Sequence, residues 1–175
     1  ECESEHGFPK PEEANEKINA ITVDFNGYIY VYGLGEFNLD ESPYNGKLRQ
    51  FKFETEEELL DSFLATWELE SPDIITGWNV RFFDIPYLVN RIGNVLKERT
   101  IRKMNRENQT YEISGVATLD YYELYQTFTY VNQESYRLDH IAFVELGKKK
   151  LSYDEYDSMA TFYKNDFQKF IEYNV

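Results

Sequence analysis

Hydrophobic and polar positions alternate along the first third of the chain, as they do in half-buried β-strands. Residues 19–25 and 28–34 are rich in β-branched and aromatic side chains, and only Asn26 and Gly27 separate them. A two-residue Asn-Gly gap between such runs is typical of a β-hairpin. Residues 48–53 alternate in the same way and predict a third strand.

After residue 54, apolar side chains recur at every third or fourth position, as in a helix, instead of at every second position, as in a strand. Thr55 and Glu58 have the spacing of a capping box, and apolar residues recur at helical intervals over 59–67. The short apolar run 73–77 is typical of a buried strand. Residues 85–96 then repeat apolar side chains at helical spacing and predict a second helix.

The last third of the chain predicts a hairpin followed by helices. Residues 99–114 alternate around a polar turn and predict a basic hairpin, 118–128 and 136–146 predict helices, and a last helix is expected to begin near Asp157. Antiparallel strands followed by a β-α-β crossover indicate an α/β fold, with a mixed sheet flanked by helices. We expect a single domain over 1–175.

Composition indicates a globular chain and limits its chemistry. The 175 residues are 42% hydrophobic and 29% charged, enough for one domain with a core. No window approaches the roughly 18 apolar residues of a membrane span, so no membrane partner is expected. Cys2 is the single cysteine, which excludes a disulfide framework and a cysteine-based zinc site. With no targeting segment visible, we expect a cytoplasmic location, which is host cytoplasm if the protein is viral.

The net charge of −14 argues against a protein that holds nucleic acid by general electrostatic attraction. It leaves room for a site that meets nucleic acid locally through divalent cations. Basic residues gather within 97–106 and at 148–150, and each group is either a solvated face or a contact surface.

The two ends of the sequence resemble interrupted elements. The chain begins at Glu1 without a methionine, and residues 1–5 have the pattern of the end of a strand. A helical pattern continues to Val175 without a stop signal. We therefore expect a fragment of a longer protein, truncated at both ends.

The run TGWNVRFFDIPYLVNR, residues 76–91, joins a predicted strand to a predicted helix. Functional sites of α/β sheets lie at such joints. Taken alone, Asp84 is better explained as a helix N-cap, and Asn79 is explained as a side chain that satisfies turn backbone. Phe82 and Phe83 would by default belong to the core. The spacing of these residues alone leaves both interpretations open.

The combination Asn-x-x-x-Phe-Asp at the end of a strand resembles the second signature of the 3′–5′ exonuclease domain of family B DNA polymerases. The segment SPDIITGWNVRFFDIPYLVNRIGNV, residues 71–95, is similar to it throughout, most of all in T-even-like bacteriophage replicative polymerases. The run LDYYELYQTFTYVNQESYRLDHIA, residues 119–142, is similar to the same group. The resemblance implies an RNase H-like fold with an inserted hairpin. It also implies proofreading, in which the 3′-terminal phosphodiester of a single-stranded primer end is hydrolysed.

The family holds two divalent cations, Mg²⁺ or Mn²⁺, with four carboxylates and a tyrosine. Hard cations select oxygen ligands, and two of them stabilise charge on the attacking and leaving oxygens. The resemblance transfers Glu1 and Asp84 as metal ligands and Tyr173 as the group that orients the attacking water. Asn79 and Phe83 transfer as contacts to the frayed primer end. The family's other two carboxylates would lie two residues before Glu1 and four after Tyr173.

Other candidates are weaker. Phe82 is a second possible base contact, whereas Trp78 is expected in the core. Asp120 and Asp139 fall in predicted helices, where we interpret them as caps or surface charges. The hairpin 99–114 matches the position of a family hairpin that helps partition the primer strand, although a solvated hairpin explains it equally well.

The resemblance also implies partners, and it leaves two alternative functions open. The partners are single-stranded primer ends, the polymerase domains of the parent chain, and a sliding clamp reached through that parent. One alternative is a stand-alone RNase H-like exonuclease, and the other is a catalytically inactive nucleic-acid-binding or scaffold module of the same fold. Because two family carboxylates lie outside these 175 residues, we expect the isolated chain to be impaired in catalysis.

Overall fold

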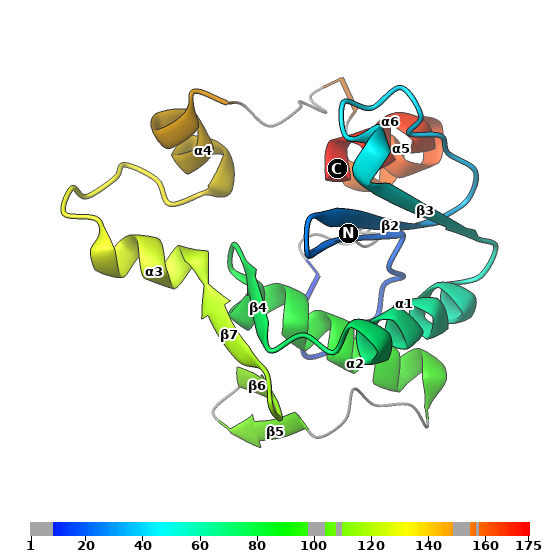
Figure 1. Cartoon of the computed structure of the whole chain (residues 1–175), viewed down its shortest axis with the longest axis horizontal. Coiled ribbons are helices and arrows are strands. Elements are labelled where there is room, and N and C mark those ends of the chain that lie inside the picture. Colours follow the sequence, from blue (N-terminus) through cyan, green and yellow to red (C-terminus); the bar gives the residue numbers. More distant parts are fainter. Residues whose placement is uncertain (1–8, 98–103, 108–109, 149–154, 157) are drawn as a thin grey trace.

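A three-stranded mixed sheet lies at the centre of the structure, a computed structural model of the chain (Figure 1). The structure describes residues 9–97, 104–107, 110–148, 155–156 and 158–175. The strands of the central sheet are β1 (Ala20–Phe25), β2 (Tyr28–Leu34) and β3 (Leu48–Phe53). β1 and β2 pair antiparallel and β3 pairs parallel with β2.

The predicted hairpin is confirmed. Phe25 lies opposite Tyr28 across a turn in which Asn26 and Gly27 have φ of 53° and 84°. Positive φ at both central residues suits the right-handed twist of the flanking strands, and asparagine and glycine are the residues that tolerate it.

Helices cover both faces of this sheet. The described helices are α1 (Glu56–Glu70), α2 (Ile85–Leu96), α3 (Tyr121–Phe128), α4 (Leu138–Leu146), α5 (Met159–Asn165) and α6 (Phe167–Asn174). α1, α2, α5 and α6 cover the sheet, whereas α3 and α4 lie away from it (Figure 1). Buried side chains of α1 and α2 share one core cluster with Tyr32, whereas those of α5 and α6 share a second with Val31. Because successive strand residues point to opposite faces, α1 and α2 lie across the sheet from α5 and α6 (Figure 1).

Two further pairs of strands complete the described part of the chain. β4 (Ile74–Gly77) and β7 (Ala117–Asp120) pair parallel, and β5 (Met104–Glu107) and β6 (Thr110–Ile113) pair antiparallel. The described strands therefore form three sheets: the predicted mixed sheet is confirmed for β1, β2 and β3, whereas β4 and β7 pair apart from it. The α/β class is confirmed, and β5 and β6 supply the strands of the predicted hairpin.

Several predicted boundaries need correction. Residues 118–120 were predicted as helix, but they belong to strand β7. The prediction failed because four residues are too few to show a hydrophobic period, and because the pairing of β7 with β4 is non-local. The predicted last helix is two helices, since Asp166 adopts φ −146° and caps α6; Asp157 lies outside the described residues. The strand expected to be buried over 73–77 exposes 57% of Ile74. No described helix has the length and apolar character needed to cross a membrane.

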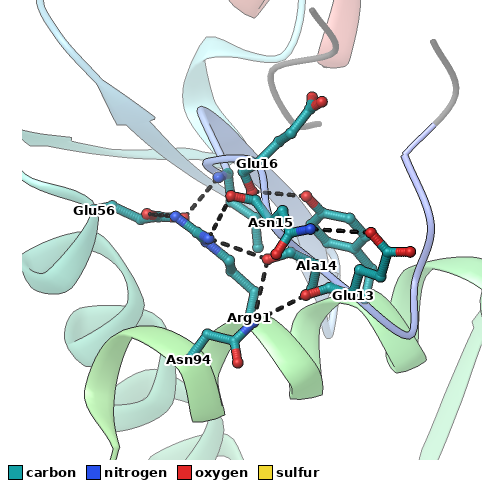
Figure 2. A network of polar contacts seen from close by, with 9 residues as sticks. Glu13, Ala14, Asn15, Glu16, Glu56, Arg91 and Asn94 are labelled. Carbon is teal, nitrogen blue, oxygen red and sulfur yellow. Dashed lines mark hydrogen bonds and ion pairs between the residues drawn. The ribbon is translucent and has the colours of Figure 1, made fainter. Parts of the chain in front are cut away.

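A polar network fastens the segment before β1 onto α1 and α2 (Figure 2). Arg91 of α2 forms a two-pronged ion pair with Glu56 of α1, at 2.8 Å for Nε–Oε1 and 2.6 Å for Nη2–Oε2. The same carboxylate accepts the backbone N–H of Ile18 at 2.7 Å, and Arg91 Nη1 donates to the carbonyls of Ala14 and Asn15. Residues that are far apart in sequence thus fix the position of the segment that leads into β1.

Candidate functional site

The carboxyl ends of β4 and β7 lie side by side. Their parallel register pairs Ile74 with Ala117 and Gly77 with Asp120, so both strands end at the same level. The turn that follows β4 therefore passes beside the start of α3. This is the edge of a parallel pair at which ligand sites of α/β proteins form.

The turn after β4 has an unusual backbone. Asn79 adopts the left-handed conformation, with φ 64° and ψ 23°. The next residues, Val80–Asp84, form one π-helical turn, closed by the N–H of Ile85 on the carbonyl of Val80. Left-handed asparagine is tolerated at tight turns, and single π turns occur frequently at functional sites.

Asp84 ends this turn with its side chain exposed. It occupies the N-cap position of α2, but its φ and ψ of −64° and −48° are helical and its side chain forms no capping hydrogen bond. Pro86 lies in the first turn, where its missing N–H is tolerated. The interpretation of Asp84 as a side-chain helix cap is therefore wrong. Its negative charge still lies at the positive end of α2.

Asn79 and the two phenylalanines share the turn with Asp84. Asn79 donates its backbone N–H to Asp120, and its side chain makes no capping hydrogen bond. Phe83 is half-buried and stacks on Tyr87, with ring centroids 5.8 Å apart. Phe82 is 50% exposed, so the expectation that it belongs to the core is wrong. Three predicted site residues (Asn79, Phe83 and Asp84) thus lie on one turn, with an exposed aromatic ring among them.

Trp78 anchors the other side of the turn. Its Nε1–H donates to the carbonyl of Tyr136 at 3.2 Å, and its ring meets Tyr122 edge-on at 5.9 Å. Trp78 is half-buried and belongs to neither core cluster of the described residues, so the expectation that it lies in the core is wrong. These contacts join the turn to α3 and to the loop before α4.

Asp120 is the residue of this site that sequence reasoning undervalued. Its side chain is almost fully buried, with the residue only 2% exposed. Oδ1 accepts the N–H groups of Asn79 at 2.8 Å and Tyr122 at 2.9 Å, and Oδ2 accepts the N–H of Arg81 at 2.9 Å. The expected cap is confirmed, because the Tyr122 bond caps α3, but the expected surface charge is wrong. Asp120 is the last residue of β7 and the N-cap of α3, a position that became visible only with the pairing of β7 and β4.

The other predicted site residues lie elsewhere or outside the described chain. Glu1 is among the residues that the structure does not describe. Tyr173, on α6, packs into the second core cluster and meets Phe162 edge-on at 5.9 Å. Of the predicted metal ligands only Asp84 is described, and its carboxylate is an oxygen donor of the kind Mg²⁺ prefers. Within the described ranges, no three acidic, histidine or cysteine side chains gather as a metal site.

Comparison with known proteins extends these observations. Residues 1–141 match the family model described as the DNA polymerase family B exonuclease domain. The chain is 34% identical to the DNA-directed DNA polymerase of Escherichia phage RB69, with all of this chain and 23% of that protein covered. It is 29% identical to the DNA-directed DNA polymerase of Enterobacteria phage T4, with 96% of this chain and 23% of that protein covered. The DNA polymerase catalytic subunit of human herpesvirus 6A is 30% identical over 89% of this chain and 18% of its own length.

The fold and the site define an α/β domain with polar side chains at the carboxyl ends of parallel strands. The chain belongs to the exonuclease domain family of the family B DNA polymerases. It spans 23% of the length of the two phage polymerases it matches.

Proposed function

We propose that the chain is the 3′–5′ proofreading exonuclease domain of a longer family B DNA-directed DNA polymerase. Its reaction is hydrolysis of the 3′-terminal phosphodiester of a single-stranded primer end, which releases a nucleoside monophosphate. One observation carries the proposal: Asn79, Phe83 and Asp84, the residues of the family signature, share a single turn at the ends of two parallel strands. The match of residues 1–141 to the family supports it.

Each residue of the proposed site has a distinct role. The exposed carboxylate of Asp84, together with Glu1, would hold the divalent cations Mg²⁺ or Mn²⁺. Such a pair of cations supplies charge stabilisation for the attacking and leaving oxygens of an in-line displacement. Tyr173 would orient the attacking water, and the side chain of Asn79 would contact the primer end.

Aromatic rings next to Asp84 suit an unpaired base. Phe82 is half-exposed and Phe83 is half-buried against Tyr87. A base that stacks on an aromatic ring contributes about 1–3 kcal/mol, whatever its identity. A site that removes any mismatched nucleotide needs such sequence-tolerant contacts. Because the chain carries a net charge of −14, these contacts and the cations replace a broad basic surface.

Other parts of the polymerase chain are the proposed packing partners of α3, α4 and the loop between them. Several large apolar side chains are exposed there: Phe128, Tyr130, Val131, Phe143 and Leu146. Exposed apolar patches of this kind mark interaction surfaces. The phage relatives are more than four times as long as the part that this chain covers. The remaining parts of such a polymerase are the candidate packing partners. We further propose a sliding clamp as partner of the parent chain, and the host cytoplasm as its location.

The test uses the longer polymerase with a 5′-labelled primer that carries a 3′-terminal mismatch. We expect stepwise shortening from the 3′ end with Mg²⁺ or Mn²⁺ and none with EDTA. Mononucleotides should be the product, and a single-stranded 3′ end should be degraded faster than a paired one. Internal cleavage, or shortening that is insensitive to EDTA, would exclude this function. A stand-alone exonuclease would show the same degradation without primer extension.

A further inference from the structure

The buried carboxylate of Asp120 connects two elements that are 41 residues apart in sequence. It accepts one N–H from its own helix, that of Tyr122, and two from the turn after β4, those of Asn79 and Arg81. A helix cap needs only the first of these bonds. Asp120 is only 2% exposed. Its two further bonds to the turn therefore indicate a second role for this side chain.

The two hydrogen bonds from Asn79 and Arg81 to Asp120 stabilise a turn whose backbone conformation is unfavourable by itself. Asn79 is left-handed, and the π turn from Val80 to Asp84 leaves the regular α-helical pattern. Unusual backbone of this kind persists only when its surroundings determine it. Asp120 fixes the N–H groups at the first residue of the turn and two residues later, just ahead of Phe83 and Asp84.

The guanidinium of Arg81 adds a second link between the same elements. Its Nη2 donates to the carbonyl of Thr118 in β7 at 3.2 Å, and its Nη1 lies 3.3 Å from Glu123 Oε2 in α3. This ion pair is more than one-third exposed on both sides, so water screens it. The buried Asp120 bonds are therefore the stronger constraint on the turn.

We propose that Asp120 is a positioning residue for the exonuclease reaction: it sets the direction of the Asp84 carboxylate by holding the backbone of Asn79 and Arg81. The proposal rests on the proposed function, because that function makes the Asp84 carboxylate a metal ligand. Asp120 itself touches neither primer nor cation in this account. A displacement of about 1 Å at a reacting group lowers the rate by about 100-fold, so a loosened turn is costly.

Replacing Asp120 by asparagine separates the two roles of the side chain. The asparagine oxygen in the place of Oδ1 keeps the bonds from Tyr122 and Asn79. Its NH₂ group, in the place of Oδ2, faces the N–H of Arg81, and two donors cannot bond to each other. Asparagine is as good an N-cap as aspartate. Asp120→Asn therefore keeps the cap of α3 and loses one bond to the turn, whereas Asp120→Ala loses all three.

The experiment measures mismatch removal, primer extension and thermal midpoint of the longer polymerase carrying Asp120→Asn. We expect exonuclease kcat to fall about 10- to 100-fold, with primer extension close to wild type and a lowered thermal midpoint, because two donors then face each other in a buried site. Asp139→Asn, the same change in the exposed first turn of α4, is the matched control and should leave all three unchanged. Thr55→Ala removes a helix cap far from the turn and should lower the midpoint without lowering kcat.

Two results would overturn the proposal. One is wild-type exonuclease kcat in Asp120→Asn; the other is a fall in kcat that Thr55→Ala reproduces at equal loss of stability. Amide hydrogen exchange gives a readout that does not depend on activity: Asp120→Asn should expose the Arg81 amide and leave that of Tyr122 protected. An inactive wild-type enzyme would refute the proposed function instead, and exchange at Arg81 would still decide whether Asp120 holds the turn.

Discussion

Replacing Arg91 by methionine tests whether the network between α1, α2 and the segment before β1 stabilises the fold. The side chains of Arg91 and Glu56 are only 12% and 7% exposed. Methionine keeps most of the apolar stem of arginine, so the change removes the charge and its hydrogen bonds more than the packing. We expect the free energy of unfolding to fall by about 3–5 kcal/mol, the usual result of breaking a buried ion pair from one side.

The magnitude follows from the bonds that are lost. Arg91 donates two hydrogen bonds to Glu56 and two to the carbonyls of Ala14 and Asn15. Without them, the Glu56 carboxylate keeps the N–H of Ile18 as its remaining bond within the network. A single hydrogen bond to a charged group contributes about 1.5–3 kcal/mol, so the loss exceeds that of one bond.

Urea unfolding followed by tryptophan fluorescence measures the effect, because Trp67 packs on Phe63 in the same core. Lys10→Met is the control: it breaks the exposed pair of Lys10 with Glu13 and should cost less than about 1 kcal/mol. The double change Glu56→Met and Arg91→Met should recover most of the lost stability, because no unpaired charge remains buried. Equal effects of Arg91→Met and Lys10→Met would refute the reasoning.

Three further changes test other parts of the structure. Burial raises the pKa of Tyr32 above its usual 10.0, so its neutral form stabilises the fold. This contribution is complete below pH 10 and is lost as the pH rises through the raised pKa. The urea midpoint of the wild type should therefore fall in that alkaline range, and it should fall less in Tyr32→Phe. Gly77→Ala places a Cβ 2.4 Å from Cγ1 of Val80, and calorimetry should show a loss of about 1–3 kcal/mol. Thr55→Ala should cost about 1 kcal/mol by urea unfolding, because it removes the capping box of α1.

The elements that the sequence predicted are those with local causes. The β1–β2 hairpin follows from Asn26-Gly27, and α1 begins where Thr55 and Glu58 cap each other. Asn79, Phe83 and Asp84 lie together because six consecutive residues contain them. Their placement at a strand-to-helix joint could therefore be predicted, although the π turn between them could not.

The features that were missed depend on contacts between distant residues. β7 is four residues long and is defined by its pairing with β4, so residues 118–120 were expected to be helical. The importance of Asp120 follows from that pairing, which brings it level with Gly77 and next to Asn79. Glu56 likewise has an ordinary place in the first turn of α1, and its partner Arg91 comes 35 residues later.

The most direct test of the central claim compares mismatch removal and primer extension by the longer polymerase carrying Asp84→Ala. We predict that metal-dependent exonuclease activity is abolished while primer extension is retained, because the carboxylate at the end of the turn would be lost and the rest of the chain kept. Asp73→Ala, which removes an exposed carboxylate just before β4, should leave both activities unchanged. Undiminished exonuclease activity in Asp84→Ala would contradict the assignment of this turn as the catalytic site.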